Sequence, residues 1–220
     1  MRGFSALCRP PGCRCRSLRS LGFWGFAMRP MVVVAGSRHL PAGYVSLVSA
    51  VIADLARRDR SVCVCCCPGA DRAALNAAVR ERCLAAVFAV AGPVSAAGWP
   101  VGFLPLDVPA WALPRVRWWA GGPASLPLRA RLVRRAASSV RFAAGSGPGA
   151  GLVCFLASPR SRGSLLALRL AVRLGLPVIV FCCGFPPGAL PALGYGAWVP
   201  VARSGVFASA VRWVPLSLFP

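Results

Sequence analysis

Three short segments of the chain contain Gly, two of them together with Ser and Arg, and these residue types commonly bind phosphate groups. They are the sequences GSR at 36–38, PGAD at 68–71 and SPRSRGS at 158–164. Gly lets backbone N–H groups approach an anion, Ser adds a hydroxyl, and Arg offers a planar pair of donors. The third segment also precedes an expected helix, whose N-terminus attracts negative charge. The candidate ligand-binding residues are Gly36, Ser37, Arg38, Gly69, Asp71, Arg160, Arg162, Gly163 and Ser164.

Apolar strands that alternate with amphipathic helices are expected to position these segments. The hydrophobic pattern predicts strands at 31–35, 61–66, 85–90, 152–157 and 177–182, and helices at 43–58, 70–82, 126–140 and 163–174. Strands that alternate with helices pair in parallel through right-handed crossovers. We therefore expect an α/β fold, an open parallel Rossmann-like sheet of about five strands in three layers. Ligands bind such sheets at the carboxyl ends of the strands, where all three segments would meet.

The chain divides by composition into a leader, a domain and a tail. Residues 1–30 carry six Arg and no acid, and we expect a disordered basic leader, with a transit peptide as the alternative. The domain is expected at 31–184, with an irregular insertion rich in Pro, Gly and Trp at 91–125 and a Gly-rich linker at 141–151. Residues 185–220 form a tail rich in Pro, Gly and Trp, to which no elements are assigned.

The charge of the chain is strongly one-sided. The sequence has 26 basic residues, all of them Arg, and five acidic ones, for a net charge of +21. Such a charge is typical of proteins that bind nucleic acid, although a GC-rich coding sequence would also favour Arg over Lys. Arg beside aromatic side chains suits single-stranded nucleic acid, with core packing as the alternative role for the two Trp. The nucleic-acid candidates are Arg115, Arg117, Trp118, Trp119, Arg129, Arg131, Arg134 and Arg135.

Membrane and metal partners are not expected. Pro and Gly interrupt both of the longest uncharged runs, so neither predicts a spanning helix. Cys63, Cys65, Cys66 and Cys67 crowd one strand, but no matching second pair follows and His39 is the only His. We therefore expect no metal and no cofactor, and buried free thiols in a reducing compartment, which indicates the cytoplasm.

The same segments resemble the SLOG superfamily, the Rossmann-like group that includes DNA-processing protein A, the cytokinin-activating phosphoribohydrolases and nucleotide-sensing domains. VVVAGSR at 32–38, PGAD at 68–71 and SRGSLLALRLAVRLGLPVIVF at 161–181 carry the resemblance, which spans about residues 31–184. The family pattern would have Gly where Cys65 stands, and Asn where Ala130 stands. The resemblance implies a nucleotide or single-stranded DNA as partner, and a homodimer is common among such proteins.

Three functions follow in order. The first is non-catalytic binding of a nucleotide or nucleotide-derived phosphate ligand at the sheet edge. The second is binding of single-stranded DNA, as in DNA-processing protein A. The third is hydrolysis of nucleoside monophosphates, but the phosphoribohydrolase motif PGGxGTxxE is absent and the only Glu is Glu81. The scarcity of titratable groups favours binding over catalysis and leaves enzymatic activity open.

Overall fold

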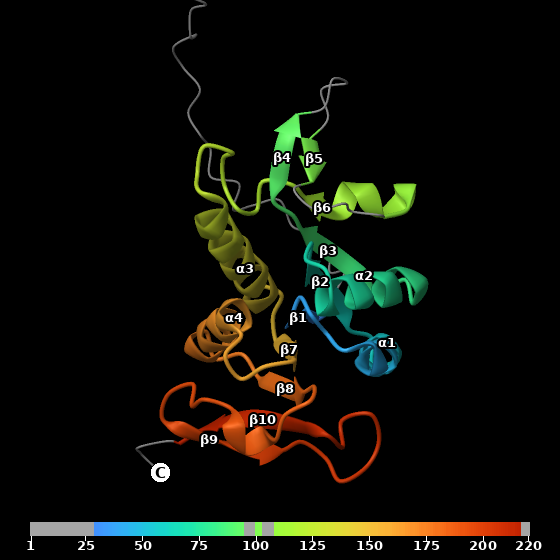
Figure 1. Cartoon of the computed structure of the whole chain (residues 1–220). Coiled ribbons are helices and arrows are strands. Elements are labelled where there is room, and N and C mark those ends of the chain that lie inside the picture. The colour runs from blue at the N-terminus through green and yellow to red at the C-terminus, as the bar shows by residue number, and fades with distance from the viewer. Residues whose placement is uncertain (1–28, 95–99, 103–107, 217–220) are drawn as a thin grey trace, which may run out of the picture.

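A central sheet of eight strands organises the chain (Figure 1). The computed structural model describes residues 29–94, 100–102 and 108–216. Five strands correspond to those expected from the hydrophobic pattern. They are β1 (Met31–Gly36), β2 (Ser61–Cys65), β3 (Leu84–Phe88), β7 (Gly151–Leu156) and β8 (Val178–Cys182). They are joined by β6 (Val116–Arg117), β9 (Gly196–Pro200) and β10 (Ala210–Pro215). The order across the sheet is β6-β3-β2-β1-β7-β8-β10-β9.

All pairings from β6 to β8 are parallel, and the last two strands run antiparallel. The strand β1 lies between β2 and β7, so that Val33 pairs with Cys63 on one side and Leu152 on the other. Every residue of β7 is buried, as expected of a central strand covered on both faces. A second, two-stranded sheet joins β4 (Ala91–Val94) to β5 (Pro100–Gly102).

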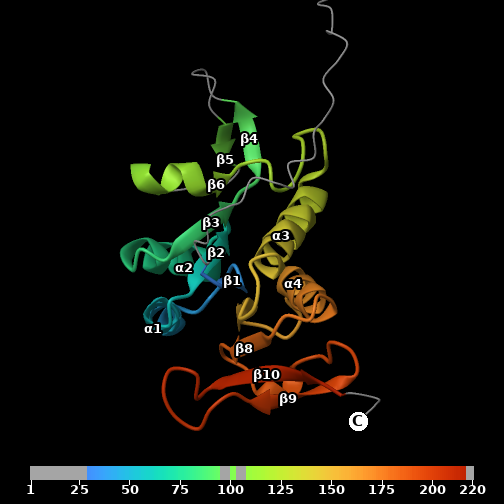
Figure 2. The ribbon, with the colours of Figure 1, turned by 180° about the vertical axis from the view of Figure 1, so that it is seen from behind.

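Four helices cover the two faces of the sheet (Figures 1 and 2). The helices α1 (Val45–Arg57) and α2 (Ala70–Arg80) pack on one face, and α3 (Leu128–Ala144) and α4 (Arg162–Arg173) on the other. Alternate residues of β1 divide between the faces, since Val32 and Val34 join the first core cluster and Val33 the second. Short 3-10 turns lie at Ala42–Tyr44, Ala110–Arg115 and Pro187–Ala189.

The end of α4 shows how local sequence fixes a boundary. Gly175 adopts a φ of 70°, which glycine tolerates best. Its N–H donates to the carbonyl of Val172, and the N–H of Leu176 donates to that of Ala171. This is the Schellman arrangement that closes many helices. The chain then enters β8. Because β8 pairs with β7 in parallel, the carboxyl ends of the two strands lie beside each other.

The structure confirms an open, mostly parallel, Rossmann-like α/β sheet and corrects its extent. The number of strands is eight rather than about five, because the tail supplies β9 and β10 and the insertion supplies β6. The insertion 91–125 is therefore not wholly irregular, since it also holds β4, β5 and a 3-10 turn. The expected linker 141–151 is shorter, because α3 continues to Ala144 before Gly145.

Two expectations fall on the ends of the chain. The basic leader expected at 1–30 lies, up to residue 28, outside the described residues. Within the described residues, the helices are too short or too polar to cross a lipid bilayer.

Candidate functional site

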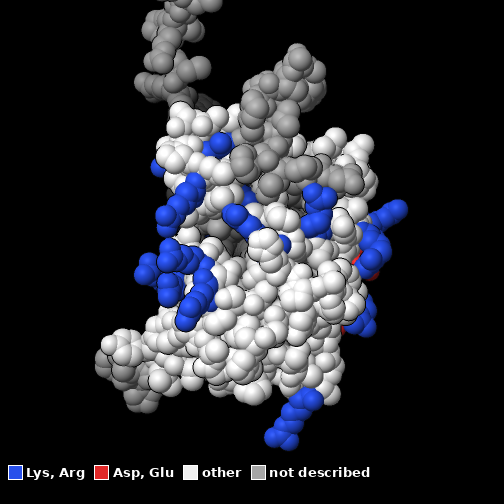
Figure 3. Space-filling model, viewed as in Figure 1, with Lys and Arg blue, Asp and Glu red and all other residues white. Residues whose placement is uncertain are grey.

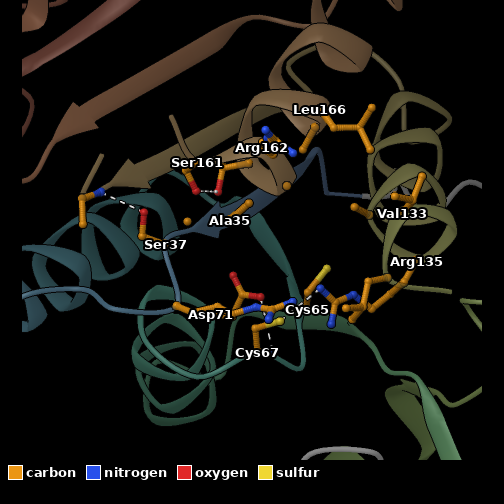
Figure 4. Close-up of a pocket in the computed structure, with 18 of the residues that line it drawn as sticks. Ala35, Ser37, Cys65, Cys67, Asp71, Val133, Arg135, Ser161, Arg162 and Leu166 are labelled. Atoms are coloured by element: carbon orange, nitrogen blue, oxygen red, sulfur yellow. Dashed lines mark hydrogen bonds between the residues drawn. The ribbon is translucent and has the colours of Figure 1, made fainter. Parts of the chain in front are cut away.

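A cavity of about 750 Å³ lies at the carboxyl ends of β1, β2 and β7, bounded by α2, α3 and α4 (Figure 4). Residues from all three segments, 36–38, 68–71 and 158–164, line it. Eight of the nine candidate ligand-binding residues line it, and these are Gly36, Ser37, Arg38, Asp71, Arg160, Arg162, Gly163 and Ser164. Gly69, the ninth, is not among the residues that line the cavity. The convergence predicted from the parallel topology is thus present in the structure.

Backbone contacts hold the first and third segments together. The buried Ser37 donates its N–H to the carbonyl of Phe155 at 2.8 Å, and its Oγ accepts the N–H of Ala157 at 2.8 Å. A Cβ on Gly36 would come within 2.4 Å of the Phe155 carbonyl oxygen, so only glycine allows this approach. Ser37 therefore contributes first to the architecture of the cavity, although its hydroxyl proton is not used by the bond to Ala157.

Gly69 shapes the second segment from behind. It precedes α2 with φ 73° and ψ −127°, and a Cβ there would lie 2.3 Å from the carbonyl oxygen of Arg38. Ala70 donates its N–H to the carbonyl of Ser37 at 3.1 Å. Gly69 therefore packs the start of α2 against the Ser37–Arg38 turn, and this packing requires glycine.

A buried guanidinium forms the floor of the cavity. Arg135 of α3 is only 6% exposed, and its two terminal nitrogens lie 3.2 Å from Cys66 Sγ and 3.3 Å from Cys67 Sγ. Within the described chain, no carboxylate lies within ion-pair distance of it. Burial lowers the pKa of Arg135, but the neighbouring thiols and Asp71 outweigh that effect and raise it. The residue is therefore a fixed positive charge inside the protein.

Asp71 lies opposite Arg135 and is the only carboxylate that lines the cavity among the residues that the structure describes (Figure 4). It is 4% exposed, and its Oδ2 accepts the N–H of Cys67 at 3.4 Å. Burial raises its pKa to about 6, while Arg135 and the backbone N–H groups of Cys67 and Gly36 act in the opposite direction. Its Oδ1 has no hydrogen-bond partner among the described residues.

The N-terminus of α4 forms the opposite wall. The first bond of the helix joins the N–H of Leu165 to the carbonyl of Ser161, so the N–H groups of residues 162–164 have no partner within the helix. Ser161 Oγ lies 3.3 Å from Ser164 Oγ. A Cβ added to Gly163 would meet nothing within 4 Å, because this position faces open space. Unpaired N–H groups and the helix dipole together favour an anion here.

Exposed Arg side chains surround the mouth. Arg38, Arg129, Arg160 and Arg162 are exposed and line the cavity, so together with Arg135 it has five guanidinium groups against one carboxylate. Figure 3 shows Arg side chains gathered over α3 and α4. The facing sides of these two helices also add apolar side chains to the lining, with Val133 44% and Leu166 36% exposed. The cavity therefore combines cationic side chains with an apolar flank formed by Val133 and Leu166.

The nucleic-acid candidates divide between two places. Arg129 and Arg135 line the cavity described above, whereas Arg131 is buried and Arg134 is exposed outside it. The other four line a second cavity of about 930 Å³ between β3, β6 and α3, and these are Arg115, Arg117, Trp118 and Trp119. The expected group of eight is therefore not one continuous surface.

In the second cavity, most of the candidate side chains have partners within the protein. The Arg117 guanidinium lies 4.3 Å from the centre of the Phe142 ring, and Arg115 donates to the carbonyl of Leu84. Trp118 packs against the core, as the alternative role for it required, whereas Trp119 is 52% exposed. Trp119 is thus the aromatic of the pair that can stack on a ligand.

Several residues of the cavity were not predicted to contact the small ligand. Arg135 was predicted only as a nucleic-acid-binding residue, yet Arg131, Arg135 and Ser139 recur every four residues and share the buried face of α3. That spacing was the signal for an inward polar stripe. Cys65 and Cys67 also line the cavity without closing it. Burial raises the pKa of Cys65 to about 12, so this thiol stays protonated.

The cysteines of the described chain are free thiols, most of them buried. The structure brings no three His, Cys, Asp or Glu side chains into a metal-binding group among the residues it describes. The Cys residues of β2 thus contribute to the core, and Cys66 and Cys67, which follow the strand, contact Arg135.

The fold and the cavity together define an α/β protein of Rossmann type with a cationic cavity at the carboxyl edge of its sheet. Neither a protein-family model nor a curated protein matches the chain. Among solved structures, the chain is similar to DNA processing protein A from Streptococcus pneumoniae, with 19% identity, a TM-score of 0.46, and coverage of 74% of this chain and 54% of that one.

A second similar structure is DNA processing protein A from Helicobacter pylori, described for its single-stranded DNA binding mode. The identity is 12% and the TM-score 0.46, over 70% of this chain and 66% of that one. The chain spans less than two thirds of the length of either of these structures.

Proposed function

We propose that this protein binds a nucleotide or a nucleotide-derived phosphate ligand in the cavity at the carboxyl edge of the sheet, without chemical turnover. The observation that carries the proposal is the concentration of five Arg and a helix N-terminus around one cavity with a single carboxylate. A phosphate group would sit between α4 and the guanidinium groups, where N–H donors and positive charge converge. The volume lies within the range of small-molecule sites, roughly 300–1,000 Å³.

The apolar flank supports a ligand larger than phosphate. Val133 and Leu166 lie on facing helices, α3 and α4, and line the cavity close to its Arg side chains. A planar base or another apolar group would cover these side chains and remove them from water, which is favourable in proportion to the area buried. A nucleotide has both parts, a phosphate for the cationic end and a base for the flank.

Thermal unfolding of the whole chain with nucleoside mono-, di- and triphosphates tests the proposal. Binding at a hundred times the dissociation constant stabilises the folded state by about 2.7 kcal/mol and raises the unfolding temperature. The variant Arg162→Gln should reduce the shift, whereas Arg169→Gln, an exposed Arg of the same helix outside the cavity, should not. The absence of a shift with every nucleotide would overturn the proposal.

Single-stranded DNA binding is the second candidate, and the exposed Trp119 beside Arg117 is the observation that favours it. The bases would stack on Trp119 while Arg side chains contact the phosphates. Oligonucleotide binding should then weaken as salt rises, and Trp119→Ala should weaken it by about tenfold or more. Tyr195→Ala is the control, since Tyr195 is 80% exposed and lines neither cavity. Binding that is insensitive to salt would contradict this candidate.

The hydrolase is the third candidate, and the positions of the acids argue against it. Glu81 follows the C-terminus of α2 and pairs with Arg80 at 3.2 Å, at the opposite end of the helix from the cavity. Asp71 is the only acid that could act on a ligand in the cavity. Release of free base from nucleoside monophosphates by the purified protein would favour hydrolysis over binding alone.

A further inference from the structure

Two polar atoms at the floor of the cavity lack partners among the described residues. They are Oδ1 of Asp71 and Nε of Arg135, on residues that are 4% and 6% exposed. Both residues line the same cavity, and Figure 4 shows their side chains pointing toward each other from α2 and α3. One atom is a hydrogen-bond acceptor and the other a donor.

The position of the Asp71 carboxylate is fixed by its other oxygen. Oδ2 accepts the N–H of Cys67, and Asp71 itself lies in the first turn of α2. The side chain therefore cannot turn outward to water without losing that bond. A buried charged group without its full hydrogen bonds lowers stability. A donor that reaches Oδ1 from the cavity would supply the hydrogen bond that the described residues do not.

A bare phosphate would not supply the missing partner. Phosphate oxygens accept hydrogen bonds and carry negative charge, so they satisfy Arg side chains but are repelled by a carboxylate. Asp71 Oδ1 requires a hydroxyl or an N–H group. A nucleoside phosphate carries both kinds, on its sugar and on its base.

We propose that Asp71 is a specificity-determining residue, whose Oδ1 accepts a hydrogen bond from a hydroxyl or N–H group of the ligand, and that it makes the cavity prefer nucleoside phosphates to bare phosphates. This inference rests on the proposed nucleotide site and adds the part of the ligand that the floor recognises. Arg135 Nε, the other atom of the cavity floor without a partner, donates a hydrogen bond to an acceptor of the same ligand.

The variant Asp71→Asn tests the assignment because it acts in opposite directions on two ligands. The amide oxygen of Asn can still accept the N–H of Cys67. The amide NH2 group then takes the place of Oδ1, so the ligand meets a donor instead of an acceptor. Adenosine monophosphate should then bind about tenfold or more weakly, as expected for the loss of a hydrogen bond to a charged group. Pyrophosphate should bind as tightly as before or more tightly, because a negative charge leaves the cavity.

Two further ligands separate the sources of the donor. Ribose 5-phosphate carries the hydroxyls without the base, and 2′,3′-dideoxyadenosine monophosphate carries the base without those hydroxyls. If the variant weakens only the first, the sugar supplies the donor. If it weakens only the second, the base supplies it. Either result supports the assignment.

The outcomes distinguish this inference from the proposed function. A parallel loss of affinity for pyrophosphate and adenosine monophosphate would overturn the role of Asp71 and leave the nucleotide site standing. Failure of the wild-type protein to bind any of these compounds would overturn both. Should Asp71→Asn not fold, the wild-type protein alone decides, because equal affinities for pyrophosphate and adenosine monophosphate would contradict the preference.

Discussion

The Oγ of Ser37 accepts the backbone N–H of Ala157 at 2.8 Å, and this bond joins two segments that are 120 residues apart in the sequence. Ser37 follows β1 and Ala157 follows β7, the two strands that pair at the centre of the sheet. The bond therefore fixes the third Gly- and Ser-rich segment against the first at the edge of the cavity. Ser37, which was predicted to bind phosphate, therefore also has a structural role.

Replacing Ser37 with Ala should lower the free energy of unfolding by about 1–2 kcal/mol, because the partly buried N–H of Ala157 loses its acceptor. Denaturant unfolding measures the change. Ser158→Ala is the matched control, since the Ser158 hydroxyl accepts only an exposed local bond from Arg160, and its effect should stay within about 0.5 kcal/mol. Equal losses in the two variants would contradict the structural role of Ser37.

Replacing Gly163 with Ala should separate stability from binding. The new methyl group meets no protein atom within 4 Å, and Ala is favoured over Gly in a helix by up to about 1 kcal/mol, so the fold should be as stable as before or more stable. The same methyl group would occupy the space over the first turn of α4, and nucleotide binding should weaken by about tenfold, or 1.4 kcal/mol. Titration calorimetry and thermal unfolding measure the two effects.

The control for Gly163→Ala is Gly43→Ala, which also places a methyl group in open space but lies in a 3-10 turn outside the cavity. Its affinity for nucleotides should equal that of the wild type. If Gly163→Ala also binds nucleotides normally, the N-terminus of α4 does not contact the ligand.

Replacing Gly69 with Ala should be much more costly than replacing a glycine of similar φ elsewhere. Gly69 has φ 73° and its added Cβ would lie 2.3 Å from the Arg38 carbonyl oxygen, so backbone strain and a clash with backbone combine. We expect a loss of about 3 kcal/mol or more. Gly147 has φ 98° with nothing within 4 Å, and its replacement should cost only about 1 kcal/mol of strain. Similar losses at both sites would show that the close approach to Arg38 is not what requires glycine.

The central sheet and the convergence of the three segments could be predicted because strong local patterns encode them. Apolar β-branched runs mark β1, β2 and β8, and parallel topology then places their carboxyl ends together. The strands of the tail were not predicted because Pro and Gly are frequent around them, although β10 carries the Val and Trp residues typical of strands. The strand β9 begins at Gly196. Glycine is required there because a Cβ would lie 2.6 Å from the Trp213 ring of β10. Such a glycine reflects tertiary packing, which no local pattern reports.

The floor of the cavity was missed for a different reason. An Arg in a helix pattern is usually exposed, and Arg135 was predicted among the nucleic-acid-binding residues of its helix. It is instead buried, and Cys66 and Cys67 contact it from the segment that follows β2, 69 and 68 residues away in sequence. Val133, an apolar residue of the same helix, is 44% exposed at the cavity. The phase of α3 about its axis is set by these long-range contacts.

The raised pKa of Asp71 predicts an unusual dependence of stability on pH. Because burial raises this pKa from 3.8 to about 6, the folded state binds the proton more tightly than the unfolded state does. The contribution of Asp71 to the free energy of unfolding is therefore most favourable below pH 3.8, falls as the pH rises toward 6, and stays low above it. At about 1.4 kcal/mol per pKa unit, the penalty at neutral pH amounts to up to about 3 kcal/mol.

Asp71→Asn removes this penalty, because the amide does not ionise. The variant should be more stable than the wild type at pH 7.5 by about 1–3 kcal/mol, and the difference should shrink to near zero as the pH falls to 4. Denaturant unfolding of both proteins at several pH values gives this difference directly and cancels the titration of groups they share, including His39. A variant that is less stable than the wild type at pH 7.5 would show that the carboxylate is well paired inside the protein, and would remove the reason to seek its partner in a ligand.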